Sequence, residues 1–310
     1  MADKIATRQA YGEFLVEKGK TAENLIVMDA DLSKSTMTAG FAKAFPDRFF
    51  NMGIAEQNLY GVAAGLAVSG KAVCASTFAV FAAGRAFEII RNSIGYTHAN
   101  VKICATHAGI TVGEDGASHQ SFEDIALMRT IPGMTVLNPS DAVSAKRLLD
   151  LAVDADGPFY IRLGRAAVPV LYDAEAAFAI GKGCVLREGR DYAILATGVM
   201  VHAALRAAEA LADEGLAVRV VDMHTIKPLD GAIVEAAARE TKGLVTAEEH
   251  SVIGGLFGAV AEYTAAHCPV RILPVGQKDT YGESGKPDEL LRKYGMSADD
   301  IADAVRRLAG

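Results

Sequence analysis

The chain has 310 residues, of which 51% are hydrophobic and 22% charged, and its formal net charge is −7. At about 150 residues per domain this length predicts two domains, and the composition excludes a disordered chain. The negative charge argues against nucleic-acid binding. The longest apolar runs are too short to span a membrane, and the N-terminus lacks the apolar stretch of a signal peptide, so we expect a cytoplasmic protein.

Four cysteines are scattered along the chain. Because none of them form a C-x-x-C pair, the pattern predicts neither a metal site nor a disulfide framework. We interpret them as free thiols in a reducing compartment.

In the first half of the chain, short apolar runs alternate with longer helical patterns. Strands are predicted at 25–29, 72–76, 101–106, 134–137 and 159–163, and helices at 55–68, 81–96, 122–130 and 142–153. Asp141 is a suitable N-cap for the last of these helices. This alternation is typical of βαβ units and a parallel sheet.

A second α/β segment follows a stretch rich in glycine and proline. Its strands are predicted at 192–196, 218–222, 244–247 and 270–275, with helices at 203–213, 231–239, 256–266 and 298–308. The predicted fold is therefore α/β with two domains, each a mostly parallel sheet flanked by helices. The expected division is 1–167 and 190–310, joined by a linker at 168–189.

Several common motifs are missing. No G-x-G-x-x-G or P-loop follows a strand, and no G-x-S-x-G is present, so dinucleotide, P-loop and serine-hydrolase sites are not expected. Glu248, Glu249 and His250 follow a predicted strand. Because they have no partner at ligand spacing, we interpret them as a polar strand end.

Ligands of parallel sheets bind outside the carboxyl ends of the strands. Five polar segments follow strands or adjoin them, at 29–36, 51–58, 76–81, 106–120 and 163–165. Glu56 is either a helix-capping charge or a buried, proton-sharing carboxylate. Phe78 and Phe81 are either core aromatics or a stacking surface for a flat ring. The segment from His107 to Gln120 combines glycines, acids and histidines, as active-site loops do.

These segments carry a family resemblance. GIAEQN around Glu56, STFAVF around Phe78 and Phe81, and HAGITVGEDGASHQ resemble the pyrimidine-binding domain of transketolases. Further on, VVDMHTIKPLD and EEHSVIGGLFGAV are similar to the C-terminal domain of that family. The GDG…N element, with which the family's diphosphate-binding domain holds Mg²⁺ and the cofactor diphosphate, is absent from the sequence. The chain therefore resembles the C-terminal subunit of a split transketolase.

The resemblance implies thiamine diphosphate and Mg²⁺ as cofactors, with the metal and the diphosphate held mainly by an N-terminal diphosphate-binding subunit. It also implies an α₂β₂ heterotetramer that transfers a two-carbon ketol unit from a ketose phosphate to an aldose or aldose phosphate. Glu56 would bond the aminopyrimidine ring, and Phe78 and Phe81 would pack against it. Asp31 and Leu32 would lie beside the cofactor.

The same resemblance implies a sugar phosphate site. The residues matching family positions that hold the substrate phosphate are Arg8, Ser35, His107 and Arg165. Asp115 matches a residue that bonds a sugar hydroxyl, and His119 one near the reacting carbonyl. Glu56, His107 and His119 would be the catalytic residues. Gly84 departs from the family, which often has a third aromatic there.

Three alternatives remain. The β subunit of a 2-oxoacid dehydrogenase has a similar architecture, but His107, Asp115 and His119 argue against it. Deoxyxylulose-phosphate synthases generally have arginine at the positions of Phe81 and His107. A non-catalytic subunit would not need this intact set of residues.

Overall fold

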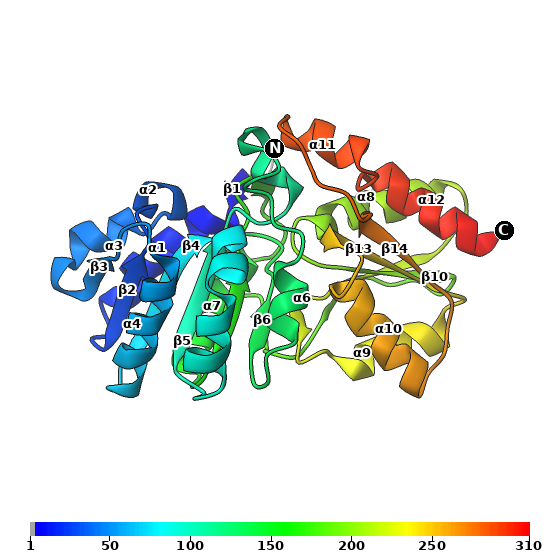
Figure 1. The fold of residues 1–310 in the computed structure, drawn as a ribbon. Helices are drawn as coiled ribbons and strands as arrows, with labels where there is room; N and C mark the ends of the chain where they lie inside the picture. The colour runs from blue at the N-terminus through cyan, green and yellow to red at the C-terminus, as the bar shows by residue number, and fades with distance from the viewer. Residues whose placement is uncertain (1–3) are drawn as a thin grey trace.

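The computed structural model describes residues 4–310 and contains one large sheet in each half of the chain (Figure 1). Across the seven-stranded first sheet, the order is β12 (Thr225–Lys227), β6 (Thr135–Leu137), β7 (Phe159–Arg162), β5 (Val101–Thr106), β4 (Ala72–Phe78), β2 (Leu25–Asp29) and β3 (Phe49–Asn51). Neighbouring strands are parallel except β12, which is antiparallel to β6.

Helices cover both faces of this sheet. Leu25 and Val27 pack towards α1 (Thr7–Gly19) and α7 (Ala142–Asp154). Alternate residues of the same strand pack towards α4 (Glu56–Val68) and α6 (Asp124–Arg129). Burial on both faces explains why the strands are continuous apolar runs.

Several short elements connect these strands. They are α2 (Ser33–Thr36), α3 (Ala39–Ala44), η1 (Pro46–Arg48), η2 (Phe81–Arg85), α5 (Phe87–Ile89), η3 (Ile90–Gly95) and η4 (Ile110–Asp115). The single helix expected at 81–96 is therefore wrong: η2 and η3 are π-helical turns on either side of α5. Such turns are rare, are found mostly as single turns inside α-helices, and often occur at functional sites.

The second sheet has five strands in the order β14 (Ile272–Gln277), β13 (Leu244–Ser251), β10 (Tyr192–Ala196), β11 (Val218–Asp222) and β9 (Cys184–Arg187). Only β9 is antiparallel to its neighbour. In Figure 1, α8 (Met200–Asp213) and α12 (Ala298–Ala309) lie above this sheet, and α9 (Gly231–Glu240) and α10 (Leu256–His267) lie below it. The predicted α/β fold with two mostly parallel sheets is confirmed.

The two halves are more interleaved than a simple linker would allow. Within the range 168–189, β8 (Ala167–Pro169) pairs with β1 (Lys4–Ala6), and β9 forms an edge of the second sheet. In addition, β12 belongs to the second half in sequence but extends the first sheet. The predicted linker at 168–189 thus contains paired strands that the sequence did not indicate, because these strands are three or four residues long and are held by long-range pairing that leaves little local signal.

Helix α7 begins at a capping box. The Asp141 carboxylate accepts the backbone N–H of Ser144 at 2.7 Å, and the Ser144 hydroxyl in turn caps Asp141. This confirms Asp141 as the N-cap. No helix of residues 4–310 combines the length and the apolar character that crossing a bilayer would take.

Asp222, at the end of β11, is a buried carboxyl with an unusual protonation equilibrium. Its Oδ2 accepts hydrogen bonds from the Ser140 hydroxyl at 2.6 Å and from Tyr172 at 2.8 Å. Burial raises the pKa of Asp222 to about 7, and those two hydrogen bonds only partly oppose the effect.

Asp222→Asn is therefore expected to change how stability depends on pH. Between about pH 4 and 7 the folded wild type keeps a proton on Asp222 that the unfolded chain releases, so its free energy of unfolding falls as pH rises. The contribution is about 1.4 kcal/mol per pH unit within that window. Urea unfolding at pH 5, 6 and 7 should show the wild type losing stability relative to the variant. A difference that stays constant with pH would contradict the assignment.

Candidate active site

The candidate site lies where the parallel strands of the first sheet end. The order β7-β5-β4-β2-β3 brings the carboxyl ends of these strands to one edge. The segments at 29–36, 51–58, 76–81, 106–120 and 163–165 therefore all adjoin that edge. Most of the polar residues discussed below come from them, as strand-end binding sites require.

Glu56 is the first residue of α4 and is only 2% exposed. Its Oε2 accepts a hydrogen bond from Arg85 at 2.9 Å, and that arginine side chain is half-exposed. Within the described residues Oε1 has no hydrogen-bond partner. Both roles considered for Glu56 are thus compatible with the geometry: its charge lies at a helix N-terminus, and one oxygen remains free to bond a ligand.

Four rings pack together beside Glu56's helix. Phe78 and Phe81 have nearly parallel rings, at 9° and 6.0 Å between centroids. The His107 ring stacks on Phe78 at 3.8 Å, and His119 meets both phenylalanines edge-on. Arg85 lies over the Phe81 ring at 5.0 Å, so a single guanidinium links this aromatic cluster to Glu56.

Asp31 and Leu32 lie in a turn that is held by hydrogen bonds to Asn51 and Asp29. Asp31 has a left-handed backbone with φ of +65°, and Asn51 bonds both its N–H and its carboxylate. The N–H of Leu32 donates to the buried carboxylate of Asp29 at 2.6 Å. The Asp29 carboxylate also accepts a hydrogen bond from the Thr36 hydroxyl. The backbone of this turn is therefore held in one conformation by these polar groups.

Arg8, Ser35 and His107 lie together. The guanidinium of Arg8 donates to the Ser35 carbonyl at 2.7 Å and lies 3.2 Å from Nε2 of His107. Because arginine only donates, Nε2 accepts and the ring proton is on Nδ1, which donates to Thr106 at 2.9 Å. Burial, followed by the charge of Arg8, lowers the pKa of His107 to about 3, so the ring is neutral at physiological pH.

Arg165 extends this cationic region. It bonds the Val112 carbonyl and the carboxylate of Glu114, the latter at 2.8 Å. Burial, and then the neighbouring charge of Arg165, lower the pKa of Arg8. Within residues 4–310 no carboxylate forms an ion pair with Arg8, whereas Arg165 is paired with Glu114. The two guanidinium groups are close enough for the charge of Arg165 to act on Arg8.

The segment 107–120 is a folded loop built on η4. Its glycines at 109, 113 and 116 all have φ near +77°, a conformation that other residues avoid. Asp115 is exposed, while His119 is half-exposed and within 3.0 Å of the Ser118 hydroxyl. Except for Arg85, the residues described around this edge either are candidate residues from the sequence or belong to the five polar segments that the sequence indicated.

Sequence reasoning missed two groups that shape the site. Arg85 directly follows Gly84. Apart from its place shortly after the STFAVF segment, nothing in the sequence indicates that it belongs to the site. Glu249 was interpreted, with Glu248 and His250, as a polar strand end. In the structure all three are buried within β13, because the strand continues to Ser251. A run of charged residues following a parallel strand was the available signal.

Comparison with known proteins agrees with this architecture. The family model described as the transketolase pyrimidine binding domain matches residues 3–170, and the transketolase C-terminal domain matches residues 181–301. A putative transketolase C-terminal section of Methanocaldococcus jannaschii is 52% identical, with 96% of this chain and 94% of that protein aligned. Human transketolase is 38% identical, and the chain covers 50% of its length.

A solved structure is similar over nearly the whole chain. It is described as a split gene transketolase, inactive beta4 tetramer, and it matches with a TM-score of 0.92, 56% identity and 98% coverage of both chains. The fold is that of the thiamine diphosphate-dependent transketolases. The chain belongs to the transketolase family, as the C-terminal subunit of a split enzyme. The matches give the dehydrogenase and synthase alternatives no better support.

Proposed function

We propose that this chain supplies the pyrimidine half of a transketolase active site, which a diphosphate-binding chain completes. The complex transfers a two-carbon ketol unit from a ketose phosphate to an aldose or aldose phosphate. The observation that carries this proposal is the buried carboxylate of Glu56, with one free oxygen, beside the parallel rings of Phe78 and Phe81. This arrangement suits a flat, hydrogen-bonding heterocycle.

The residues present fit the aminopyrimidine of thiamine diphosphate. Glu56 would bond a ring nitrogen and share its proton, while Phe78 and Phe81 would pack against the ring. Asp31 and Leu32 would lie beside the cofactor, on the turn that Asn51 fixes. When bound, the cofactor supplies a nucleophilic carbon and an electron sink for the two-carbon unit.

Arg8, Ser35, His107 and Arg165 would hold the phosphate of the sugar. Arginine suits this role because its planar fork donates two charge-assisted hydrogen bonds to a phosphate. His107 is neutral, so it adds no further charge beside the two guanidinium groups. Asp115 would bond a sugar hydroxyl, and His119 would lie near the reacting carbonyl and move a proton to or from its oxygen.

We also propose that a separate N-terminal subunit holds Mg²⁺ and the diphosphate. In residues 4–310 no group of three or more potential ligands is placed to hold a metal ion. The chain also exposes apolar side chains on β3, around α4 and close to Glu56 in sequence, including Ile54 at 78% and Val68 at 77%. Exposed apolar residues beside an active site that a second chain would complete favour a protein–protein interface at this surface.

The domain boundaries follow the same proposal. Residues 1–167 would form the pyrimidine-binding domain and 190–310 the C-terminal domain, with 168–189 connecting them through β8 and β9.

The names of similar proteins mention different sugars, so they do not identify the substrate of this chain. One relative, from a Clostridium species, is a 6-deoxy-6-sulfo-D-fructose transketolase subunit, and one from Phocaeicola vulgatus is an apulose-4-phosphate transketolase subunit.

Co-expression with the matching diphosphate-domain chain tests this function. With thiamine diphosphate and Mg²⁺, the complex should release glyceraldehyde 3-phosphate from xylulose 5-phosphate when ribose 5-phosphate is the acceptor, and neither chain alone should. Mass measurement in solution should give two copies of each chain. A folded, cofactor-bound complex that decarboxylates 2-oxo acids and transfers no ketol unit would contradict the proposal.

A further inference from the structure

Glu249 comes from the second half of the chain but contacts the loop 107–120 of the first. It lies near the end of β13 and is 3% exposed. Its Oε1 accepts the backbone N–H of Thr111 at the start of η4. A Cβ added to Gly109 would lie 2.3 Å from the carboxyl carbon of Glu249. The glycine is therefore required for this close approach as well as for its positive φ.

A second part of the C-terminal half contacts the other end of the same loop. Gln120 donates to the Glu283 carbonyl at 2.9 Å and to the Ile110 carbonyl at 3.3 Å. A Cβ on Gly116 would meet the Ser284 hydroxyl at 2.5 Å. The helix that follows, α11 (Pro287–Lys293), packs against η4 and lies over the junction between the two halves in Figure 1. The loop is thus held at both ends by the C-terminal half.

Glu249 is itself fixed by a buried polar network. Arg162 donates to the Glu249 backbone carbonyl at 2.9 Å and to the carboxylate of Asp124 at 2.8 Å. Tyr160 donates to the same carboxylate. Burial is the largest influence on the pKa of Asp124 and raises it, but the charge of Arg162 and the hydrogen bonds from Arg162 and Tyr160 act together against burial, so the pKa is lowered overall.

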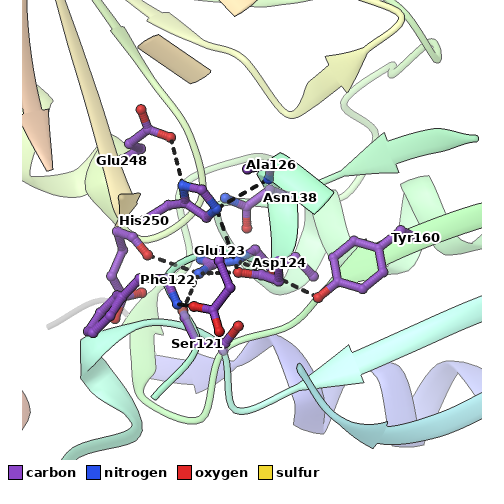
Figure 2. A network of polar contacts seen from close by, with 12 residues as sticks. Ser121, Phe122, Glu123, Asp124, Ala126, Asn138, Tyr160, Glu248 and His250 are labelled. Carbon is purple, nitrogen blue, oxygen red and sulfur yellow. Dashed lines mark hydrogen bonds and ion pairs between the residues drawn. The ribbon is translucent and has the colours of Figure 1, made fainter. Parts of the chain in front are cut away.

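His250 ties the same strand to α6. In Figure 2 its ring lies between Glu248 and the start of α6, with Tyr160 on the far side of Asp124. Its Nε2 accepts from the Ala126 N–H at 3.3 Å, so Nδ1 carries the proton and donates to the Ser251 carbonyl at 2.7 Å. The strand that carries Glu249 is therefore hydrogen-bonded to the first half of the chain at Glu249 and at His250.

We propose that the C-terminal domain positions the substrate loop of the active site, and that Glu249 is the positioning residue. By holding the N–H of Thr111, its carboxylate fixes the loop that carries His107, Asp115 and His119. The consequence for substrate rests on the proposed function, because those three side chains are assigned there to the sugar phosphate. Glu56, Phe78 and Phe81 lie outside this loop.

Hydrogen–deuterium exchange in the chain on its own tests the positioning directly. In Glu249→Ala, the amides of residues 109–116 should exchange about tenfold faster than in the wild type, because one buried hydrogen bond is lost. Glu249→Gln keeps an acceptor oxygen and should restore most of the protection. If Glu249→Ala exchanges in this loop at the wild-type rate, the positioning role is wrong.

Glu248→Ala is the matched control. Glu248 is equally buried on the same strand, but it accepts the N–H groups of Leu256 and Phe257 at the start of α10. This variant should lower the melting temperature without opening the loop. Loop opening as large as in Glu249→Ala would mean that general destabilisation, and not positioning, is measured.

The complete complex separates positioning from a purely structural role. In Glu249→Ala the KM for the sugar phosphate should rise about tenfold, with the Kd for thiamine diphosphate unchanged. An equal loss of affinity for both would contradict the proposal. If the wild-type complex transfers no ketol unit, the proposed function fails, and the exchange experiment still decides the role of Glu249.

Discussion

The Glu56→Gln variant of the complete complex is expected to lose between about 10²- and 10⁴-fold in kcat. Glutamine has the size of glutamate and keeps one acceptor oxygen, so α4 and the aromatic cluster should remain in place. What it loses is the ability to share a proton with the aminopyrimidine ring. Steady-state ketol transfer, measured at saturating cofactor and sugar phosphates, gives the size of the effect.

Arg85→Gln is the control for this experiment. Arg85 is the partner of Glu56 in the structure, and its side chain is half-exposed. If the Glu56 variant failed only because an ion pair was broken, the two variants would be impaired to a similar degree. A complex that keeps wild-type kcat with Glu56→Gln would overturn the catalytic role of this carboxylate.

The second large effect is expected at Arg8. In Arg8→Ala, kcat/KM for a phosphorylated donor should fall about 10- to 100-fold, because charge-assisted hydrogen bonds to phosphate are lost. The same enzyme should react with an unphosphorylated ketose as well as the wild type does. Comparison of the two donors under identical conditions measures the phosphate-specific part of the effect.

Arg147→Ala provides the matched control, because Arg147 lies on α7 and bonds the Ala174 carbonyl away from the site. Arg8→Lys should recover part of the activity, since it keeps the charge but loses the planar fork. Equal losses for phosphorylated and unphosphorylated donors in Arg8→Ala would show that Arg8 supports the fold and not the phosphate.

Much of the scaffold could be predicted because it is encoded locally. The strands at 25–29 and 101–106 match β2 and β5, since residues buried on both faces form uninterrupted apolar runs. The capping box at Asp141 is equally local. In contrast, β12 and β9 are edge strands defined by distant partners, and the π-helical turns around α5 preserve a helical pattern while changing the geometry.

The residues of the candidate site also fall into those that the sequence predicts and those that it does not. Glu56, Phe78 and His107 could be proposed because each lies at the end of a strand of the same parallel sheet or shortly after it. Glu249 could not, because its role depends on how the second sheet packs against a loop more than a hundred residues earlier. The run of charged residues at 248–250 indicates a polar strand end, but the role of Glu249 can be assigned only when its partners are known.

In the proposed complex the active site is split between two chains. Isothermal titration of thiamine diphosphate, in the presence of Mg²⁺, into this chain, into the diphosphate-binding chain and into their mixture tests this division. We predict tight, saturable binding only in the mixture, and its loss when Phe78 and Phe81 are both replaced by alanine. Binding of equal affinity to this chain alone would show that the site does not need a second chain and would contradict the account.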